Sequence, residues 1–289
     1  NESSTGHKSD GSIKCYTIYM YIGVDVGGTK TLVALLNDEG VITQRHKFPT
    51  PEKYEDFLDQ LSQWRKGLRT DDLRGGGIGL PGLIDRENGI SLGSPHVHWD
   101  NASVKSDCEQ IVGCPFVIEN DANMAALSEA MLHKDSRAVL YLTVSTGIGS
   151  GFIYNKRIEP ALVKSEGGHL LLPDEGRIDK WENFASGRAI YQKFGKPAAQ
   201  ITDEGAWQSI AHNLSLGIFE HVAILQPDIV IIGGSIGTYF DCYEKYLMDR
   251  LKTYELPIVP IPKIVKAQRP EQAVIYGCYD LAKQEIADA

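Results

Sequence analysis

The chain has 289 residues and a formal net charge of −9, with 42% hydrophobic and 23% charged residues. This composition is ordinary for a globular protein with a sizeable core, so it excludes a disordered chain, and the length suits two domains or one large one. The acidic balance offers no electrostatic footprint for nucleic acid or an anionic membrane, so we expect neither as a partner. A phosphorylated ligand would then depend on local backbone donors and a metal ion.

The start of the chain and its cysteines indicate a cytoplasmic protein. Residues 1–19 are polar and lack the apolar segment of a signal peptide, so we expect a disordered leader or tail before Met20. No apolar stretch approaches the ~20 residues that a membrane span needs. Five scattered cysteines without a C-x-x-C pair argue against a disulfide scaffold and against a thiolate metal site.

The first half begins with three strand-like runs, YIGVDV, TLVALL and VITQRH, separated by a Gly-Gly turn and an Asn-Asp-Glu-Gly turn. This pattern predicts an antiparallel meander. Apolar residues at helical spacing predict a helix over residues 54–64. The runs GGGIGLP and PFVIE read as buried strands, and residues 122–133 as an alanine-rich helix.

The second half repeats this order of elements. AVLYLTVS and SGFIY are strand-like around the turn TGIG, and RIEP follows a second turn. Residues 210–225 predict a long helix that ends before Pro227, DIVIIGG is a buried strand, and residues 271–286 predict a closing helix. A coincidence of turns is the alternative, but the same order occurring twice favours a duplicated βββαβα unit. We therefore expect two α/β lobes with a cleft between them.

Three glycine turns are candidates for binding a nucleotide. The first, after a strand, contains Asp25, Gly27, Gly28, Thr29 and Lys30. Its N–H groups can form an anion-binding nest, and Asp25 would act on phosphate through Mg²⁺ or the water around it. A plain hairpin turn explains this segment equally well. The case becomes stronger because comparable turns follow two strands of the second half.

The second turn contains Thr146, Gly147 and Gly149, and the third contains Gly233 and Gly234, where a nucleotide base can lie on backbone.

Two familiar nucleotide-binding motifs are matched in part but fail on their sequence context. Residues 77–82 fit G-x-G-x-x-G, but Pro81 and the residues after it do not open a helix. Residues 23–30 nearly fit a P-loop, but Thr29 stands where the lysine belongs.

Carboxylates and one imidazole form the candidate acid–base and sugar residues. Asn120 and Asp121 follow a strand and begin a helix, so one can cap the helix while the other accepts a proton from a hydroxyl group. Glu166 and His169 surround two glycines, and Glu182 follows. Such groups suit the vicinal hydroxyls of a sugar, although a lone histidine is more often a structural residue than a ligand.

Taken together, DVGGTK, GLPGLID, ENDAN, STGIGSG, EGGH and WENFASGRAI resemble the ROK family of sugar kinases and repressors, from about residue 20 to residue 282. The resemblance implies a duplicated ribonuclease-H-like fold of the actin-like ATPase type, with two lobes and a central cleft. It implies an N-terminal lobe over residues 20–120, a C-terminal lobe over 121–270 and a closing helix, 271–286, that packs back on the first lobe. It also suggests a homodimer.

The resemblance also implies residue roles. Asp121 is the catalytic base, and the three glycine turns bind ATP, with Asp25 holding Mg²⁺ indirectly. The implied sugar contacts are Gly82, Asn120, Asp121, Glu166, His169 and Glu182. The family's cysteine cluster is missing between EGGH and ASG, so we expect no zinc. His96 stands where many members carry asparagine, which leaves that sugar contact open.

We expect transfer of the γ-phosphoryl group of ATP to the 6-hydroxyl of a hexose, with glucose as the first candidate. N-acetylmannosamine, fructose and polyphosphate as donor remain alternatives, because family members that use polyphosphate also lack the cysteine cluster. A sugar-responsive repressor is a hypothesis of another class. Only 19 residues precede Met20, without the apolar pattern or basic surplus of a DNA-binding module.

Overall fold

The computed structural model describes residues 19–68 and 72–286 of the chain. Its first five-stranded sheet has the order β3-β2-β1-β4-β7. Strands β1, β2 and β3 pair antiparallel, as the meander predicted, whereas β4 and β7 add to β1 in parallel. The bounds are β1 (Met20–Val26), β2 (Lys30–Asn37), β3 (Ile42–Pro49), β4 (Leu73–Leu80) and β7 (Phe116–Asn120).

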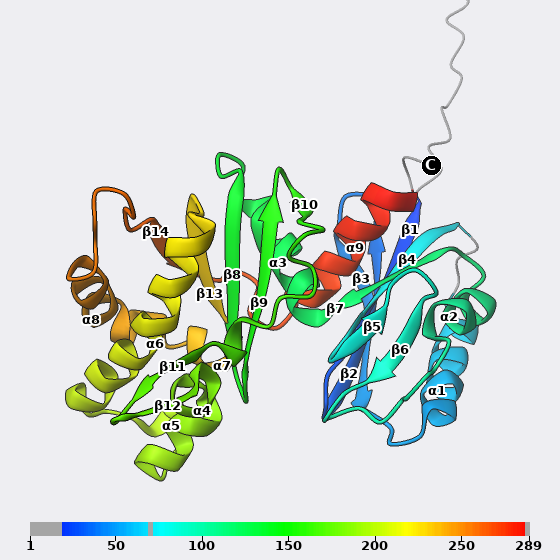
Figure 1. Cartoon of the computed structure of the whole chain (residues 1–289). Helices are drawn as coiled ribbons and strands as arrows, with labels where there is room; N and C mark the ends of the chain where they lie inside the picture. Colours follow the sequence, from blue (N-terminus) through cyan, green and yellow to red (C-terminus); the bar gives the residue numbers. More distant parts are fainter. Residues whose placement is uncertain (1–18, 69–71, 287–289) are drawn as a thin grey trace, which may run out of the picture.

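The second sheet repeats the first. Its order is β10-β9-β8-β13-β14, again an antiparallel meander extended by two parallel strands (Figure 1). The duplication expected from the order of elements is therefore confirmed. The bounds are β8 (Ala138–Val144), β9 (Ile148–Tyr154), β10 (Arg157–Ile158), β13 (Ile229–Gly233) and β14 (Lys263–Lys266).

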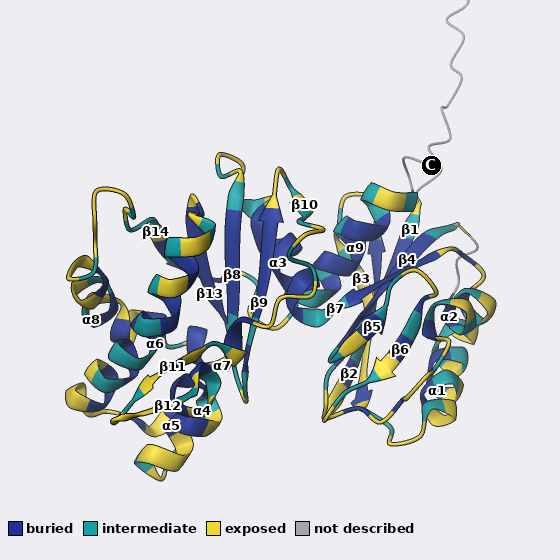
Figure 2. Cartoon of the chain, in the orientation of Figure 1, coloured by how far each residue is buried: buried dark blue, intermediate teal, exposed yellow. Residues whose placement is uncertain are grey.

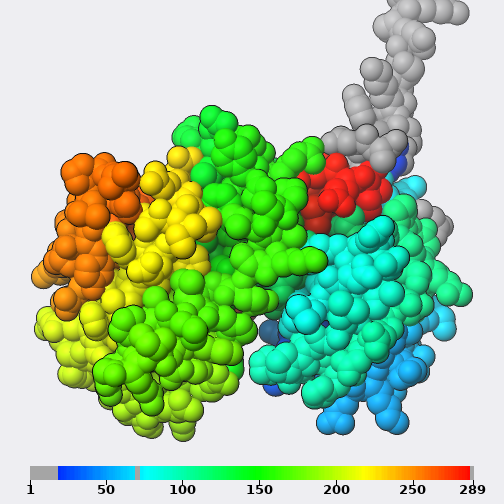
Figure 3. All heavy atoms as spheres, viewed as in Figure 1, coloured from blue at the N-terminus to red at the C-terminus, as the bar shows by residue number. Residues whose placement is uncertain are grey.

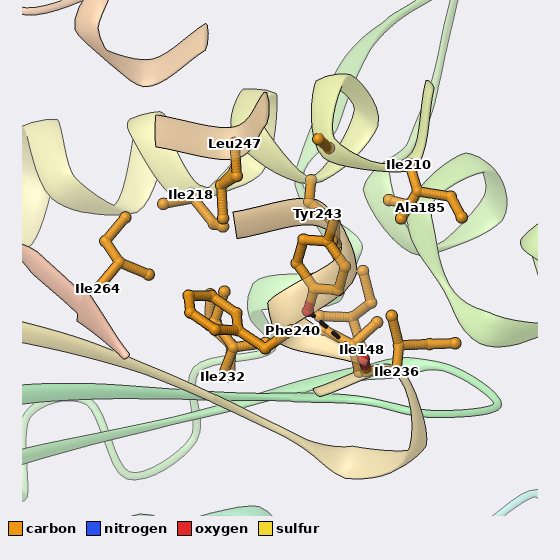
Figure 4. Close-up of a cluster of buried hydrophobic side chains, with 14 of the residues drawn as sticks. Ile148, Ala185, Ile210, Ile218, Ile232, Ile236, Phe240, Tyr243, Leu247 and Ile264 are labelled. Atoms are coloured by element: carbon orange, nitrogen blue, oxygen red, sulfur yellow. Dashed lines mark hydrogen bonds between the residues drawn. The ribbon is translucent and has the colours of Figure 1, made fainter. Parts of the chain in front are cut away.

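Helices cover both faces of each sheet, so central strands such as β8 and β13 are mostly dark blue, buried ribbons in Figure 2, whereas the edge strand β3 is largely exposed. On the first sheet, α1 (Tyr54–Lys66) and α2 (Val104–Val112) share one apolar core with β1 and β2. On the second, α6 (Glu204–Leu225) and α8 (Phe240–Lys252) cover the outer face. Figure 4 shows this core, in which the Tyr243 hydroxyl donates to the carbonyl of Ile236 at 3.5 Å.

Two helices lie between the sheets. Helix α3 (Asp121–Leu132) packs on β8 and β9, and α9 (Ala273–Ile286) packs on β1 and β4. The two helices also pack on each other, at the centre of Figure 1. The closing helix expected from the sequence therefore lies on the first sheet. We retain as a proposal the division of the chain at residues 120 and 121, where β7 ends and α3 begins.

Glycines on β4 explain how α9 comes so close to the first sheet. A Cβ atom on Gly75 would lie 2.8 Å from Ile286, and one on Gly77 would lie 2.7 Å from the carbonyl oxygen of Cys278. Because side chains alternate along a strand, these glycines present a bare backbone to one helix face. The strand then turns at Leu80 into the short strand β5 (Leu83–Asp85). This confirms the rejection of a dinucleotide motif here, since no helix follows.

Several elements were not predicted. They are the hairpin of β5 with β6 (Ile90–Gly93), the hairpin of β11 (Leu171–Asp174) with β12 (Arg177–Lys180), the helices α2, α4 (Trp181–Ala185), α5 (Gly187–Phe194), α7 (Gly234–Gly237) and α8, the 3₁₀ turns η1 (Gly167–His169) and η2 (Ala198–Gln200), and β14. The expected leader lies outside the described residues except for Tyr19. Among the described helices, none combines the length and apolar character of a membrane span.

Candidate active site

A cleft of 660 Å³ collects residues from both halves of the chain. Asp25 contributes from the end of β1 and Asp121 from the start of α3, while Gly234 and Ser235 contribute from the turn after β13. Figure 3 shows a hollow in the molecular surface where the two halves meet. The residues that line the cleft are Asp25, Asp121, Ala122, Ala125, Tyr141, Thr143, Ser145, Gly234, Ser235, Thr238, Tyr239, Pro270, Glu271, Ala273 and Val274.

Asp121 stands at the junction of β7 and α3. The side chain of Asn120 caps the helix by accepting the Ala122 N–H at 2.9 Å, and the Asp121 carboxylate accepts the same N–H at 2.8 Å. Burial raises the pKa of Asp121 to about 6, the Ala122 N–H opposes that rise, and the charge of Glu166 adds to it. The pKa of this carboxyl group thus lies near neutral pH, which suits a general base.

Asp25 lines the same cleft. Burial is the main cause that raises its pKa to about 7, the charge of Asp121 contributes further, and Lys47 opposes the rise. In the sheet register Asp25 lies opposite Gly79, and Gly79 lies opposite Glu119. The carboxyl ends of three parallel strands therefore bring Asp25 near the junction that holds Asp121.

The rest of the first glycine turn lies at the surface. Gly28, Thr29 and Lys30 are exposed, and a Cβ atom on Gly28 would lie 2.8 Å from the side chain of His96. Gly27 accepts the hydroxyl of Thr50 through its carbonyl oxygen at 2.6 Å. Of this segment, Asp25 lines the cleft, so the phosphate role of the other four residues stays a prediction.

The second and third glycine turns are joined by one hydrogen bond. The Ser145 hydroxyl accepts the N–H of Ser235 at 3.0 Å, and both residues line the cleft. Gly234, with φ of +75°, also lines it. Thr146 is not among the residues that line the cleft, so its phosphate role stays a prediction.

Three predicted glycines have neighbours that explain their lack of a side chain. Gly233 packs against the hydroxyl of Tyr141, a Cβ atom on Gly149 would lie 2.9 Å from Thr143, and one on Gly147 would lie 2.6 Å from Glu182. Gly147 thus connects the second turn to a predicted sugar residue. The other two glycines have clear packing reasons, and their nucleotide contacts stay predictions.

Three of the predicted sugar residues, Glu166, His169 and Glu182, are linked at the turn η1. His169 and Glu182 approach to 3.4 Å through Nε2 and Oε1, and the N–H of Ile148 donates to the other oxygen of Glu182 at 3.4 Å. The backbone N–H of His169 donates to the carbonyl oxygen of Glu166 in the turn η1. Within this group, the charge of Glu166 contributes to the raised pKa of Asp121.

The backbone conformation and close packing at position 82 explain why a glycine is found there. Its φ is +84°, and a Cβ atom there would overlap the backbone of Gly93 and the side chain of Ser94. Such a backbone favours glycine at the entry to the β5–β6 hairpin. A sugar contact at Gly82 stays a prediction.

Sequence reasoning missed part of the cleft. Tyr141 and Thr143 alternate along β8 and face the cleft, and burial raises the pKa of the Tyr141 phenol. Their period-two spacing before the second glycine turn is a signal that could have found them. Pro270 and Glu271 reach the cleft from the segment before α9, and a local pattern does not reveal that.

The residues fit a magnesium ion better than zinc. Asp25 and Asp121 offer hard carboxylate oxygens, both with raised pKa, beside the hydroxyl groups of Thr143 and Ser145. Mg²⁺ is typically held by one or two carboxylates, water and substrate phosphates. Across residues 19–68 and 72–286, no cluster of three or more His, Cys, Asp or Glu side chains could hold a metal ion.

The repeated sheet and the cleft with its aspartates define a two-lobed protein of the actin-like ATPase fold. A model of the ROK family matches residues 21–285, so the chain belongs to the ROK family. The resemblance and the fold class predicted from the sequence are both confirmed.

Relatives of this chain include sugar kinases. The glucokinase of Streptomyces coelicolor is 28% identical and covers 91% of this chain and 97% of its own length. The N-acetyl-D-glucosamine kinase of Escherichia coli O157:H7 is 28% identical over 89% of this chain and 97% of its own. The structure of a ROK glucokinase from Streptomyces griseus with glucose and AMPPNP has a TM-score of 0.77 and 25% identity, and covers 93% and 100% of the two chains. They confirm the expectation of a sugar phosphotransferase.

Proposed function

We propose that this protein transfers the γ-phosphoryl group of ATP to the 6-hydroxyl of a hexose, with glucose as the first candidate. The observation that carries the proposal is the Asp121 carboxylate, which shares one cleft with Asp25 and the Gly234 turn and whose pKa is raised to about 6. A base of this proton affinity can accept the proton of an alcohol, and exposed backbone N–H groups can bind the phosphates of a nucleotide. The glucokinase relatives support glucose.

In the proposed reaction Asp121 accepts the proton of the sugar 6-hydroxyl. The freed oxygen electron pair attacks the γ-phosphorus of ATP, the bond to the bridging oxygen breaks, and ADP leaves with that electron pair. Positioning and electrostatic stabilisation supply most of the rate in such transfers. Water must be excluded, because it would otherwise act as the acceptor.

Asp25 would hold a magnesium ion, directly or through water, and the bound ion would supply positive charge to the phosphates. Backbone N–H groups in the turns near Ser145 and Gly234 would add donors to the same phosphates. We propose that Glu166, His169 and Glu182 hold the sugar hydroxyls, since His169 and Glu182 approach each other and the charge of Glu166 acts on Asp121.

The sugar and the donor have named alternatives. N-acetyl-D-glucosamine is a candidate sugar because an N-acetyl-D-glucosamine kinase is as identical to this chain as the glucokinase is. N-acetylmannosamine and fructose are the alternatives that the sequence analysis left open. Polyphosphate remains the alternative donor. A homodimer and a cytoplasmic location are further expectations that belong to this proposal.

A coupled ADP-release assay tests the proposal. The purified protein is given ATP and a panel of glucose, fructose, mannose, N-acetylglucosamine and N-acetylmannosamine, and polyphosphate replaces ATP in a parallel series with sugar phosphate as readout. We expect the highest kcat/KM with ATP and glucose. If the protein binds a sugar but turns over no combination of sugar and phosphoryl donor, the kinase proposal is contradicted and a sugar-responsive regulator is favoured.

A further inference from the structure

Glu119, two residues before Asp121 in the chain, forms a partly buried ion pair with Arg86. Glu119, in β7, is 4% exposed, and Arg86 follows β5. The guanidinium donates from Nε to Oε2 at 2.7 Å and from Nη2 to Oε1 at 2.5 Å. Removing two charges from water is costly, so stability by itself is a weak reason for a buried pair.

The Glu119 carboxylate also organises the start of α3. Its Oε1 accepts the backbone N–H of Asn120 at 2.6 Å and the side-chain amide of Asn123 at 3.0 Å. Asn120 and Asn123 lie on either side of Asp121 in the chain. Glu119 therefore holds the segment that carries the candidate base from both directions.

The same groups reach into the second half of the chain. The carbonyl oxygen of Val163 accepts from Nη2 of Arg86 at 3.1 Å and from the amide of Asn123 at 3.0 Å. Val163 lies three residues before Glu166, in the segment between β10 and η1. The two donors thus attach the Glu166 segment to the strand that leads to Asp121.

We propose that Arg86 and Glu119 are positioning residues, which set the distance between Asp121 and the segment that carries Glu166. This inference rests on the proposed function, in which Glu166 holds the sugar and Asp121 accepts its proton. Misplacing a reacting group by about 1 Å can cost on the order of 100-fold in rate. The network acts on the sugar side, because its contacts do not include the residues of the Gly234 turn.

Steady-state kinetics of Arg86→Met test the inference. We expect kcat to fall on the order of 10- to 100-fold and the sugar KM to rise severalfold, whereas the ATP KM stays within about twofold. Lys266→Met, which breaks the exposed pair of Lys266 with Asp241, is the matched control and should leave all three constants unchanged. A purely structural role would lower the active fraction without raising the sugar KM.

A double variant separates positioning from folding. Arg86→Met leaves Glu119 buried without its partner, so its Tm should fall, and Arg86→Met with Glu119→Gln should recover Tm by removing that charge. We expect the double variant to keep the raised sugar KM, because the Arg86 donor to Val163 is still missing. Recovery of the kinetic constants together with Tm would overturn the inference.

Hydrogen–deuterium exchange without substrate gives a readout that does not depend on turnover. Arg86→Met should increase exchange over residues 159–169, and Lys266→Met should not. Unchanged exchange there would overturn the positioning role even in an active kinase. If the wild type has no turnover with any hexose, the proposed function fails, and the exchange data still decide whether the pair holds this segment.

Discussion

Opposing influences set the proton affinity of Asp121. Burial disfavours the charged carboxylate, while the N–H of Ala122 at the helix start favours it, and the result is a pKa of about 6. Glu166 raises the pKa further by its own charge. At pH 7 the carboxylate is largely ionised and ready to accept a proton, yet it remains a stronger base than an ordinary aspartate.

Replacing this base should abolish turnover without removing the site. Asp121→Asn keeps the size and one acceptor of the side chain but cannot accept a proton, so we expect kcat to fall by on the order of 10²–10⁴. Sugar affinity, measured by calorimetry, should stay within about tenfold, because most proposed sugar contacts remain. Asp59→Asn, at an exposed position of α1, is the control. Wild-type kcat in Asp121→Asn would refute the assignment.

The pH dependence of kcat/KM should show the same carboxyl group. The base must be ionised, so the rate should fall as pH drops through about 6, the value to which the pKa is raised. In Glu166→Gln the acid limb should move to lower pH, because a neighbouring negative charge is removed. A pH-rate profile from 4.5 to 9 measures both. An acid limb near pH 4 in the wild type would contradict the burial argument.

At the scale of elements, the contact between α3 and α9 joins the two halves of the molecule. Gly277 of α9 lies against the backbone of Met124 in α3, so close that a Cβ atom would overlap its carbonyl oxygen. Met124 is three residues beyond Asp121, and α9 rests on β1, the strand that ends near Asp25. The closeness of these two helices therefore helps to place the site carboxylates.

Widening this crossing should destabilise the fold. Gly277→Ala places a methyl group against backbone that cannot rotate away, and overpacking of this kind costs about 1–3 kcal/mol. Gly205→Ala, in the exposed first turn of α6, meets only the carboxylate of the N-cap residue Asp203, at 3.3 Å, and should change stability by less than about 1 kcal/mol. Urea unfolding of both variants measures the difference, and equal midpoints would disprove the packing argument.

At the scale of the whole molecule, carboxyl groups with raised pKa values in the site and in α9 reduce the stability of the fold. Asp25 and Asp280 have pKa values raised to about 7, with burial as the main cause in each, and Asp121 has one raised to about 6. A carboxyl group whose pKa is higher in the folded state than in the unfolded state opposes folding when ionised. This cost is full above the folded pKa and is relieved as pH falls toward the unfolded value of about 4.

Removing one such charge should therefore stabilise the protein in alkaline solution. We expect Asp25→Asn to raise Tm by several °C at pH 8, since each kcal/mol shifts Tm by about 2–4 °C in a chain of this size class. The gain should shrink progressively between about pH 7 and pH 4, as the wild-type carboxyl group protonates. Thermal unfolding against Asp59→Asn at each pH measures it, and a gain that grows as pH falls would reverse the sign of the argument.

The local pattern of the sequence predicted most of the fold. Period-two and helical spacing, glycine turns and repeated order predicted both meanders, the helices over 54–64 and 210–225, and the duplication, because these depend on neighbouring residues. The hairpins β5–β6 and β11–β12 and the helix α8 were missed. The hairpin segments are short or polar and take their structure from packing against the lobes. Helix α8 carries a signal of its own that was overlooked, because its buried residues Phe240, Tyr243, Leu247 and Leu251 follow helical spacing.

The sequence by itself determined which chemistry is available: the Asp121 carboxylate within ENDAN at a helix start, glycine turns after strands, and membership of the ROK family. Only the tertiary structure decided which groups meet. Tyr141 reaches the cleft, Ser145 holds the turn of Ser235, and Arg86 holds Glu119 across 33 residues of chain. Such contacts join residues from distant strand ends, and the packing of two sheets on α3 and α9 brings those ends together.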